Sequence, residues 1–361
     1  MRQKKRILVC PLDWGLGHAT RCIPIIRLLL QKNQHVLIAG SGRSFLLLKH
    51  EFPTLEFIDL PGYDIRYSKS ALAIRMFFSI PKILKGIKQE HELLQEIIQQ
   101  KKIDIVISDN RFGLWSTKVK TVFITHQLMI KSPLGEYVLH RINLNYIKKF
   151  NTCWIPDFEG ETNLSGDLTH FYPTPENAVF IGPLSRFYNE KSSLLCQPLK
   201  KSYDVMVIIS GPEPQRSIFE EIILKQASSI PLNFLIVRGI TEETFRLERI
   251  ENIDVIPHLN TADMKAAIQS ASVVVARSGY STLMDLAVLG RKVILIPTPG
   301  QTEQEYLAAF YQKKKLAYVE SQSGFNLKRA LEKIKDYEDL SQEFGDGLQT
   351  KLNAVIEVIL Q

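Results

Sequence analysis

The chain contains 361 residues, 45% hydrophobic and 23% charged, the composition of a soluble globular protein long enough for about two domains. No segment approaches the ~18 apolar residues of a membrane-spanning helix, and the basic N-terminus lacks the longer apolar run of a secretory signal peptide. The four cysteines show no C-x-x-C spacing, which argues against a zinc site and a disulfide framework. We therefore expect a cytoplasmic protein with reduced thiols.

The net charge of +7 is concentrated in the first half of the chain. Residues 1–187 hold 25 Lys and Arg against 16 Asp and Glu, whereas residues 188–361 hold 20 against 22. This difference indicates different partners for the two halves, and charge alone is compatible with nucleic acid, an anionic membrane or an acidic substrate. Because aromatic residues are not interleaved with Lys and Arg as a stacking platform, we expect no nucleic-acid partner.

Short apolar runs rich in β-formers alternate with helical patterns along most of the chain. In the first half, strands are expected at residues 6–12, 35–39, 55–60, 103–108, 121–125, 153–156 and 179–181. A polar, aperiodic stretch at residues 189–203 indicates a linker. In the second half, strands are expected at residues 204–210, 233–237, 253–257, 273–276 and 293–297, and a helical tail from residue 325.

Strands that alternate with helices indicate mainly parallel sheets covered by helices on both faces. We therefore predict an α/β protein with two tandem Rossmann-like domains facing a cleft. The domains comprise residues 1–188 and, after the linker 189–203, residues 204–361 with the helical tail. Ligands of such sheets bind outside the carboxyl ends of the strands, so the loops after the strands are the candidate sites.

The loop after the first strand contains Gly15, Gly17 and His18 and leads into a helix. The glycines let an anion or a sugar approach the backbone at the helix N-terminus, and the imidazole of His18 is a candidate general base. A nicotinamide cofactor is disfavoured because Thr20 occupies the third glycine position and no carboxylate follows the second strand. The alternatives are a tight turn without a ligand and a solvent-exposed histidine.

The loop after residue 276 has the pattern of a phosphate-binding helix start. Ser278, Gly279, Ser281 and Thr282 place small and hydroxyl-bearing residues at the beginning of a helix, where N–H groups can be capped or can bind a phosphate. Asp285 follows one turn later and could accept hydrogen bonds from a ribose diol. The alternative is a well-capped helix whose early acid complements the dipole.

Two further loops of the second half carry candidate groups. Ser210 and Gly211, with Arg216 after them, could bind a phosphate, although two prolines in this loop remove N–H donors. Gln304 and Glu305 follow the last expected strand and have the amide and carboxylate groups that suit sugar hydroxyls. The alternative for this pair is a solvated helix start.

The segment from Arg277 to Asp285, followed by Leu289-Gly290, Ile296-Pro297 and Gln304-Glu305, resembles the donor-binding segment of glycosyltransferase family 28, which has the GT-B fold. That family includes the N-acetylglucosaminyltransferase that makes lipid II. The specific resemblance covers roughly residues 255–310, and the two-domain layout covers the rest of the chain. In the family, the loop at Ser278–Thr282 approaches the diphosphate, and the acid matching Asp285, usually a Glu with a longer arm, binds the ribose hydroxyls.

The resemblance implies roles for four other residues. Gln304 and Glu305 match the pair that contacts the donor sugar, and the segment at His258 matches the region that holds uracil through backbone bonds. Arg186 matches an arginine at the end of the first domain and is a candidate to stabilise the leaving diphosphate. The family's loop at the position of Ser210 is richer in Gly and Ser, so the resemblance is weaker there.

The first loop, with Gly17-His18 and Arg21-Cys22, also resembles the UDP-sugar hydrolase of pseudaminic acid synthesis. Both proteins use a nucleotide sugar, but the acceptor is a hydroxyl group in one and water in the other. We therefore expect an inverting transferase that uses a UDP-sugar, with UDP-N-acetylglucosamine as the candidate donor and His18 as the base. The alternatives are a nucleotide-sugar hydrolase or epimerase and a non-enzymatic nucleotide-binding protein. No cofactor or metal is expected, because no Asp-x-Asp motif occurs.

Residues 66–88 form a basic and apolar segment with no acid between Asp64 and Glu90. Pro81 lies within this segment, which predicts two short helices or a helix and a loop. Lys and Arg next to Phe, Ile and Leu are typical of a segment that lies in a membrane interface. We expect peripheral contact with an anionic membrane and a glycan or glycolipid acceptor, as in the family. The alternative is a helix packed on the core with a solvated basic face.

Overall fold

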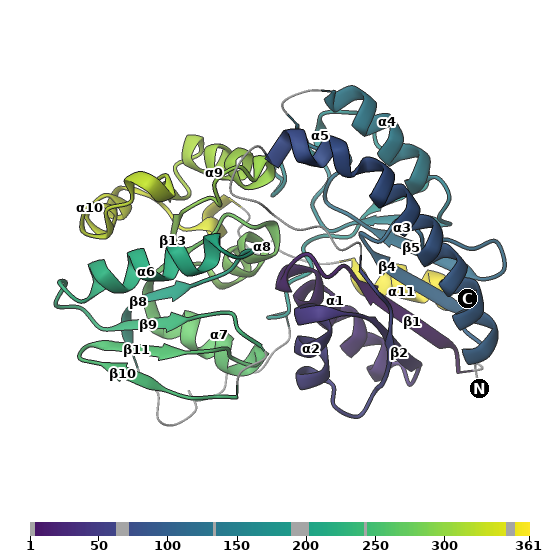
Figure 1. The fold of residues 1–361 in the computed structure, drawn as a ribbon, viewed down its shortest axis with the longest axis horizontal. Coiled ribbons are helices and arrows are strands. Elements are labelled where there is room, and N and C mark those ends of the chain that lie inside the picture. The colour runs from purple at the N-terminus through teal and green to yellow at the C-terminus, as the bar shows by residue number, and fades with distance from the viewer. Residues whose placement is uncertain (1–3, 63–71, 133–134, 189–201, 242–243, 344–350) are drawn as a thin grey trace. The chain divides into compact units, whose positions relative to one another are not determined.

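The computed structural model describes residues 4–62, 72–132, 135–188, 202–241, 244–343 and 351–361, and for residues 72–81 it describes the backbone alone. The chain divides into two compact α/β units (Figure 1). The first unit comprises Met1–Leu184 with Leu348–Gln361, and the second comprises Ser185–Gly347.

The first unit contains a seven-stranded sheet in the order β3-β2-β1-β4-β5-β6-β7, in which every pair of neighbours is parallel. Its elements are β1 (Arg6–Pro11), α1 (Leu16–Gln31), β2 (His35–Gly40), α2 (Gly42–Glu51), β3 (Glu56–Asp59), α3 (Leu72–Lys101), β4 (Ile105–Asp109), β5 (Lys120–Ile124), α4 (Glu136–Ile147), β6 (Thr152–Ile155), α5 (Asp167–His170), β7 (Ala178–Phe180) and α11 (Leu352–Leu360).

The side chains of each strand contribute alternately to two hydrophobic cores, because successive residues of a strand point to opposite faces of the sheet. Ile7 and Val9 of β1 pack with residues of α1, α2 and α11, whereas Leu8 and Cys10 pack with residues of α3. The strand order changes direction between β1 and β4, so the loops after these two strands border the topological switch point.

The second unit repeats this arrangement with the sheet order β10-β11-β9-β8-β12-β13-β14, in which only the β10–β11 pair is antiparallel. Its switch point lies between β8 and β12. Its elements are β8 (Tyr203–Ile208), α6 (Gln215–Ala227), β9 (Phe234–Val237), β10 (Glu248–Ile250), β11 (Ile253–Ile256), α7 (Thr261–Ser270), β12 (Ala271–Ala276), α8 (Tyr280–Leu289), β13 (Lys292–Leu295), α9 (Thr302–Lys313), β14 (Tyr318–Val319) and α10 (Leu327–Lys333), with short 3-10 turns at Gln322–Gly324, Ile334–Asp336 and Leu340–Glu343.

The expected α/β class and the mainly parallel sheets are confirmed, and all the strands expected from the sequence are present. The structure adds β10, whose residues are exposed, and β14, which has two residues. The expected linker lies outside the described residues apart from residues 202–203. In the described residues, no helix is both long and apolar enough to cross a membrane.

Two expectations about helices are wrong. The backbone of α3 continues through Pro81 as one helix, because a proline removes one hydrogen bond but keeps a helical φ, and the turns on both sides are retained. The C-terminal tail does not belong wholly to the second domain, because α11 packs in the first unit. Leu352 and Ile356 join the core beside α1, and Lys32 of α1 forms an ion pair with Glu357.

The placement of α11 can be tested with two substitutions on the same helix. Ile356 is fully buried, so Ile356→Ala should lower the free energy of unfolding by about 2–5 kcal/mol. Val358 is 64% exposed, so Val358→Ala should change it by less than about 0.5 kcal/mol. Urea unfolding gives both values, and hydrogen exchange should show the lost protection in β1 and β2. Equal effects of the two substitutions would contradict the placement.

Candidate active site

Four polar side chains of the first unit meet at the carboxyl ends of β1, β4 and β5. His18 and Arg21 lie in the first turns of α1, which follows β1, and Asp109 is the last residue of β4. His126 follows β5. These strands are neighbours in the sheet, so their carboxyl ends bring together residues that are up to 108 positions apart.

Asp109 is the centre of this cluster. Its Oδ1 atom lies 2.9 Å from Nδ1 of His18, and the guanidinium of Arg21 donates to both of its oxygens through Nε and Nη2. The Nη1 atom of Arg21 lies 3.1 Å from Nδ1 of His126. Arg21 and Asp109 are buried, and the side chain of His18 is 16% exposed.

Burial and the neighbouring charges set the protonation states of the pair. Burial, followed by the charge of Arg21, lowers the pKa of His18, and Asp109 opposes this shift. Burial acts to raise the pKa of Asp109, but Arg21 and His18 outweigh it and lower the pKa to about 2. At neutral pH the cluster therefore holds a carboxylate and a neutral imidazole, which is the protonation state of a general base.

The predicted glycine loop shapes the approach to His18. Gly15 has φ 149° and ψ 159°, a conformation that is essentially restricted to glycine, and it precedes α1 without a side-chain cap. Two hydroxyl groups hold the loop in place. Ser44 Oγ of α2 donates to the carbonyl of Gly15 at 2.9 Å, and Thr20 Oγ1 of α1 donates to the carbonyl of Gly17 at 3.0 Å.

The sequence pointed to His18 but not to its partners. Asp109 and His126 were missed as site residues because their contacts depend on the strand order of the sheet, and Arg21 was noted only as part of a resemblance. A signal for Asp109 was present, since a carboxylate that ends an otherwise apolar strand must be paired or solvated.

In the second unit the structure brings together Asp285 and Arg186, two residues singled out from the sequence. Ser185 Oγ donates to Asp285 Oδ1 at 2.6 Å, and Arg186 Nε lies 3.4 Å from Oδ2. Burial raises the pKa of Asp285, although Arg186 and Ser185 act in the opposite direction. Both carboxylate oxygens therefore have partners within the protein. A ribose diol that bound to Asp285 would have to share the carboxylate with Ser185 and Arg186.

The start of α8 leaves room for a ligand. Gly279 is the N-cap residue with φ −75°, and no side chain caps the helix, so the capping by Ser281 or Thr282 that we considered does not form. A Cβ atom added at Gly279 would meet no atom within 4 Å. The N-terminus of α8 therefore faces open space beside the ends of β12 and β13.

Arg277 fixes the loops around this helix start. The residue is 1% exposed, and its guanidinium donates to the carbonyls of Pro297 and Gln215 at 3.3 and 2.9 Å and to Gln322 Oε1 at 2.6 Å. No carboxylate among the described residues pairs with it, and burial lowers its pKa to about 10. A buried positive charge without a counter-ion raises the local potential and favours a bound anion.

The predicted sugar-contacting pair lies in the same group of loops. Ser278 Oγ donates to the carbonyl of Gln304 at 2.7 Å, and Gln304 Oε1 accepts from the N–H of Thr298 at 2.8 Å. Glu305 is exposed, and its Oε1 accepts from the N–H of Gly300 at 2.9 Å. These side chains therefore shape the turn after β13.

The loop after β8 reaches the same edge of the sheet. Ser210 is half-buried, and a Cβ atom added at Gly211 would lie 3.5 Å from Thr298 Oγ1, so this loop lies against the turn after β13. Arg216, considered as a phosphate ligand, is instead buried and forms ion pairs with Glu213 and Glu220 at 2.6 and 2.9 Å.

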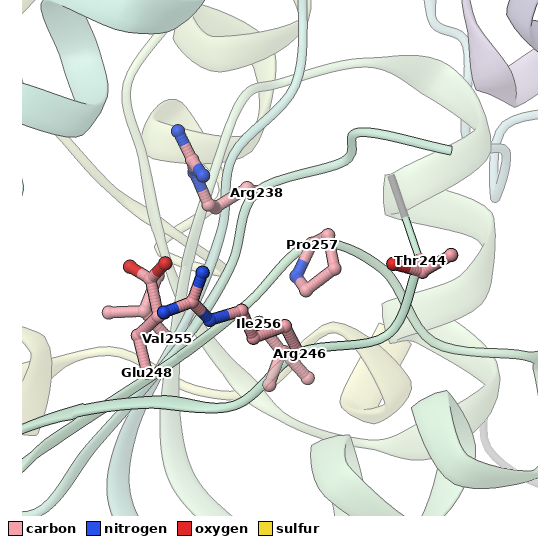
Figure 2. Close-up of a pocket in the computed structure, with 7 residues that line it drawn as sticks. All are labelled: Arg238, Thr244, Arg246, Glu248, Val255, Ile256 and Pro257. Atoms are coloured by element: carbon pink, nitrogen blue, oxygen red, sulfur yellow. The ribbon is translucent and has the colours of Figure 1, made fainter. Parts of the chain in front are cut away.

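A pocket of about 260 Å³ opens near the ends of β9 and β11 (Figure 2). Ile256 and Pro257 give it an apolar wall, and Arg238, Arg246 and Glu248 contribute charged groups; Thr244 and Val255 complete the lining. The next residue, His258, was predicted to lie in the base-binding segment, and its Nδ1 donates to the carbonyl of Ile240 at 3.1 Å. Among the described residues, no group of three His, Cys, Asp or Glu side chains could hold a metal ion.

Residues 215–352 match the glycosyltransferase family 28 C-terminal domain. An uncharacterized glycosyltransferase of Methanosarcina mazei is 24% identical over 86% of this chain and 84% of its own length. The UDP-N-acetylglucosamine–N-acetylmuramyl-(pentapeptide) pyrophosphoryl-undecaprenol N-acetylglucosamine transferase of Halalkalibacterium halodurans is also 24% identical, over 89% of this chain and 87% of its own.

Among solved structures, a spinosyn rhamnosyltransferase in complex with thymidine diphosphate aligns with 99% of this chain and 100% of its own, at a TM-score of 0.67 and 11% identity. This likeness shows the fold. Together with the sequence matches, it confirms the resemblance expected from the sequence. The chain is a glycosyltransferase with the GT-B fold, and its second unit is of the family 28 type.

Proposed function

We propose that this glycosyltransferase moves N-acetylglucosamine from a UDP-sugar donor to a hydroxyl group of a glycan or glycolipid acceptor, with inversion and without a metal ion. The first unit would bind the acceptor and supply the base, and the second would bind the donor. The relatives whose names specify UDP-N-acetylglucosamine support this choice of donor. The observation that carries the proposal is the buried pair of His18 and Asp109 at the switch point of the first sheet.

The protonation state of this pair suits the proposed reaction. Asp109 holds the proton of the imidazole on Nδ1, so Nε2 of His18 can take the proton of the acceptor hydroxyl. The acceptor oxygen then forms a bond to the anomeric carbon, and the bond from that carbon to the diphosphate breaks. Displacement from the opposite face inverts the anomeric configuration, and UDP leaves with the negative charge.

The second unit offers groups for each part of the donor. The N–H groups at the start of α8 and the buried charge of Arg277 favour the diphosphate. Asp285 with Arg186 would bind the ribose hydroxyls, and the pocket beside Pro257 would receive the base. Ser210 and Gly211 would border the diphosphate, and Gln304 and Glu305 the sugar.

The donor site can be tested at Gly279. Valine readily adopts the backbone conformation of this residue, and its Cβ meets no neighbour, so Gly279→Val should leave the melting temperature without ligand within a few degrees of the parent's. The added side chain should occupy the space of the diphosphate. UDP at millimolar concentration should raise the melting temperature of the parent by mass action, and much less that of the variant. The site is wrong if UDP stabilises both proteins equally, and the choice of donor fails if GDP or dTDP stabilises the parent more than UDP.

The base can be tested separately. His18→Ala should lower turnover by about 10²–10⁴-fold with little change in UDP affinity, because the imidazole acts on the proton of the acceptor. Release of UDP from UDP-N-acetylglucosamine, with and without candidate acceptors, measures turnover, and His50→Ala, at an exposed histidine, is the matched control. A fully active His18→Ala enzyme would move the base to Asp13 or another group. Rapid UDP release that is independent of an acceptor would favour a hydrolase.

We also propose that residues 66–88 contact an anionic membrane that carries the acceptor. Residues 66–71 and the side chains of residues 72–81, including Phe77 and Phe78, lie outside what the structure describes. In the described part of this segment, Lys82, Lys85 and Lys88 are exposed together with Leu84, which is 44% exposed, whereas Ile87 packs against Leu12 in the core. The exposed lysines support the proposal, since each adds about 1 kcal/mol near an anionic surface.

Vesicle co-sedimentation tests this contact. The parent should bind vesicles rich in an anionic phospholipid at low salt and dissociate at high salt, because salt screens the attraction. Lys82→Glu/Lys85→Glu should bind several-fold less. Lys328→Glu/Lys333→Glu, the same charge change at exposed positions of the second unit, should bind as the parent does. Binding that is absent at low salt, or unaffected by the first pair of substitutions, would favour a soluble acceptor.

A further inference from the structure

We propose that Arg21 is a positioning residue for His18: its guanidinium locks the carboxylate of Asp109 in place and keeps the imidazole neutral, with its proton on Nδ1 and Nε2 open to the acceptor. The catalytic relevance of this arrangement rests on the proposed function. The arrangement itself rests on contacts within the first unit.

The guanidinium of Arg21 is held from several sides. Arg21 is 2% exposed and directs its N–H groups to three side chains. Nε and Nη2 contact the two oxygens of Asp109, as a planar fork and a carboxylate do when they pair bidentately, and Nη1 lies 3.1 Å from His126 Nδ1. An arginine cannot accept, so Nδ1 of His126 is the acceptor in this contact. Arg21 is therefore fixed from the ends of both β4 and β5.

The contacts of His18 also place the proton of its imidazole. Nδ1 of His18 lies 2.9 Å from Asp109 Oδ1 and also 2.9 Å from Nη2 of Arg21. The ionised Asp109 can only accept, so an unprotonated Nδ1 would place its lone pair against a carboxylate oxygen. With the proton on Nδ1, both nitrogens donate to the same oxygen, and this shared acceptor accounts for their short separation. The proton is then absent from Nε2.

The charges around His18 nearly balance. The charged and titratable groups that face His18 are Arg21 on its own helix, Asp109 from β4 and His126 from the loop after β5. Cys22 also faces Asp109, and its thiol lies 3.7 Å from Oδ2. Asp109 alone would stabilise an imidazolium, which cannot take a proton. Arg21 cancels that charge, and with burial it leaves the pKa of His18 below its ordinary value.

Asp109 and Arg21 therefore have different effects on the imidazole of His18. Asp109 directs the tautomer, and Arg21 prevents Asp109 from also holding the imidazole in its charged form. The base then stays available at a pH below the ordinary midpoint of histidine, about 6.5. Activity controlled by His18 should therefore decline only at a more acidic pH.

The test is a histidine titration by ¹H–¹⁵N NMR with selective ¹⁵N-histidine labelling, in which His18→Gln identifies the signal of His18 among the eight histidines. In the parent, His18 should be neutral at pH 6.5 with the proton on Nδ1. In Arg21→Gln, the titration midpoint of His18 should rise by about one pH unit or more, because the uncompensated carboxylate of Asp109 remains beside the imidazole. Arg21→Lys, which restores the charge, should return the midpoint toward the parent's.

Arg27→Gln is the matched control, because this residue lies on the same helix but pairs with Glu51, and it should leave the midpoint of His18 unchanged. If Arg21→Gln does not fold, the parent spectrum decides, since a proton on Nε2 or a charged His18 at pH 7 overturns the proposal. Equal midpoints in the parent and a folded Arg21→Gln protein also overturn it. Because no nucleotide is present, failure here is distinct from failure of the proposed donor, which the UDP melting experiment reports.

Discussion

A guanidinium buried inside a protein needs acceptors for its N–H groups and a balance for its charge, and two buried arginines, one in each unit, meet this constraint in different ways. In the first unit, Arg21 has a carboxylate partner, Asp109, which joins α1 to the end of β4. In the second unit, Arg277 contacts carbonyl and amide oxygens and gathers the loops after β12 and β13 with the start of α6. In the function that we propose, the compensated charge lies beside the base, and the uncompensated charge favours the binding of an anion.

Some parts of the fold can be predicted from the sequence and others cannot. Buried parallel strands such as β1 and β4 contain continuous apolar runs, Ile7–Cys10 and Ile105–Ile107, and that signal can be read without knowledge of the tertiary structure. Exposed β10 and the two-residue β14 carry no such signal, because their hydrogen bonds to a neighbour define them. The amphipathic pattern of α11 predicts a helix, but it does not specify which of two apolar sheets the helix covers.

In the candidate site too, the sequence predicts single residues but not their contacts. Residue types at the ends of strands pointed to His18, Gly279 and Asp285, since the chemistry of a loop can be read locally. The partners of these residues could not be predicted, because contacts between residues 88 or 100 positions apart depend on how the sheets are assembled. For Asp285 the difference matters, because Ser185 and Arg186 already contact the carboxylate that the sequence suggested for a ribose.

The return of α11 to the first unit has a consequence for biosynthesis. The second unit is one continuous segment, Ser185–Gly347, whereas the first unit combines residues that precede and follow this segment. During translation, β1 to β7 emerge before the second unit, and Leu352 and Ile356, whose side chains complete their core, emerge after it. The core beside α1 therefore keeps an open apolar surface while the whole second unit is being made, and such a surface is of the kind that chaperones bind.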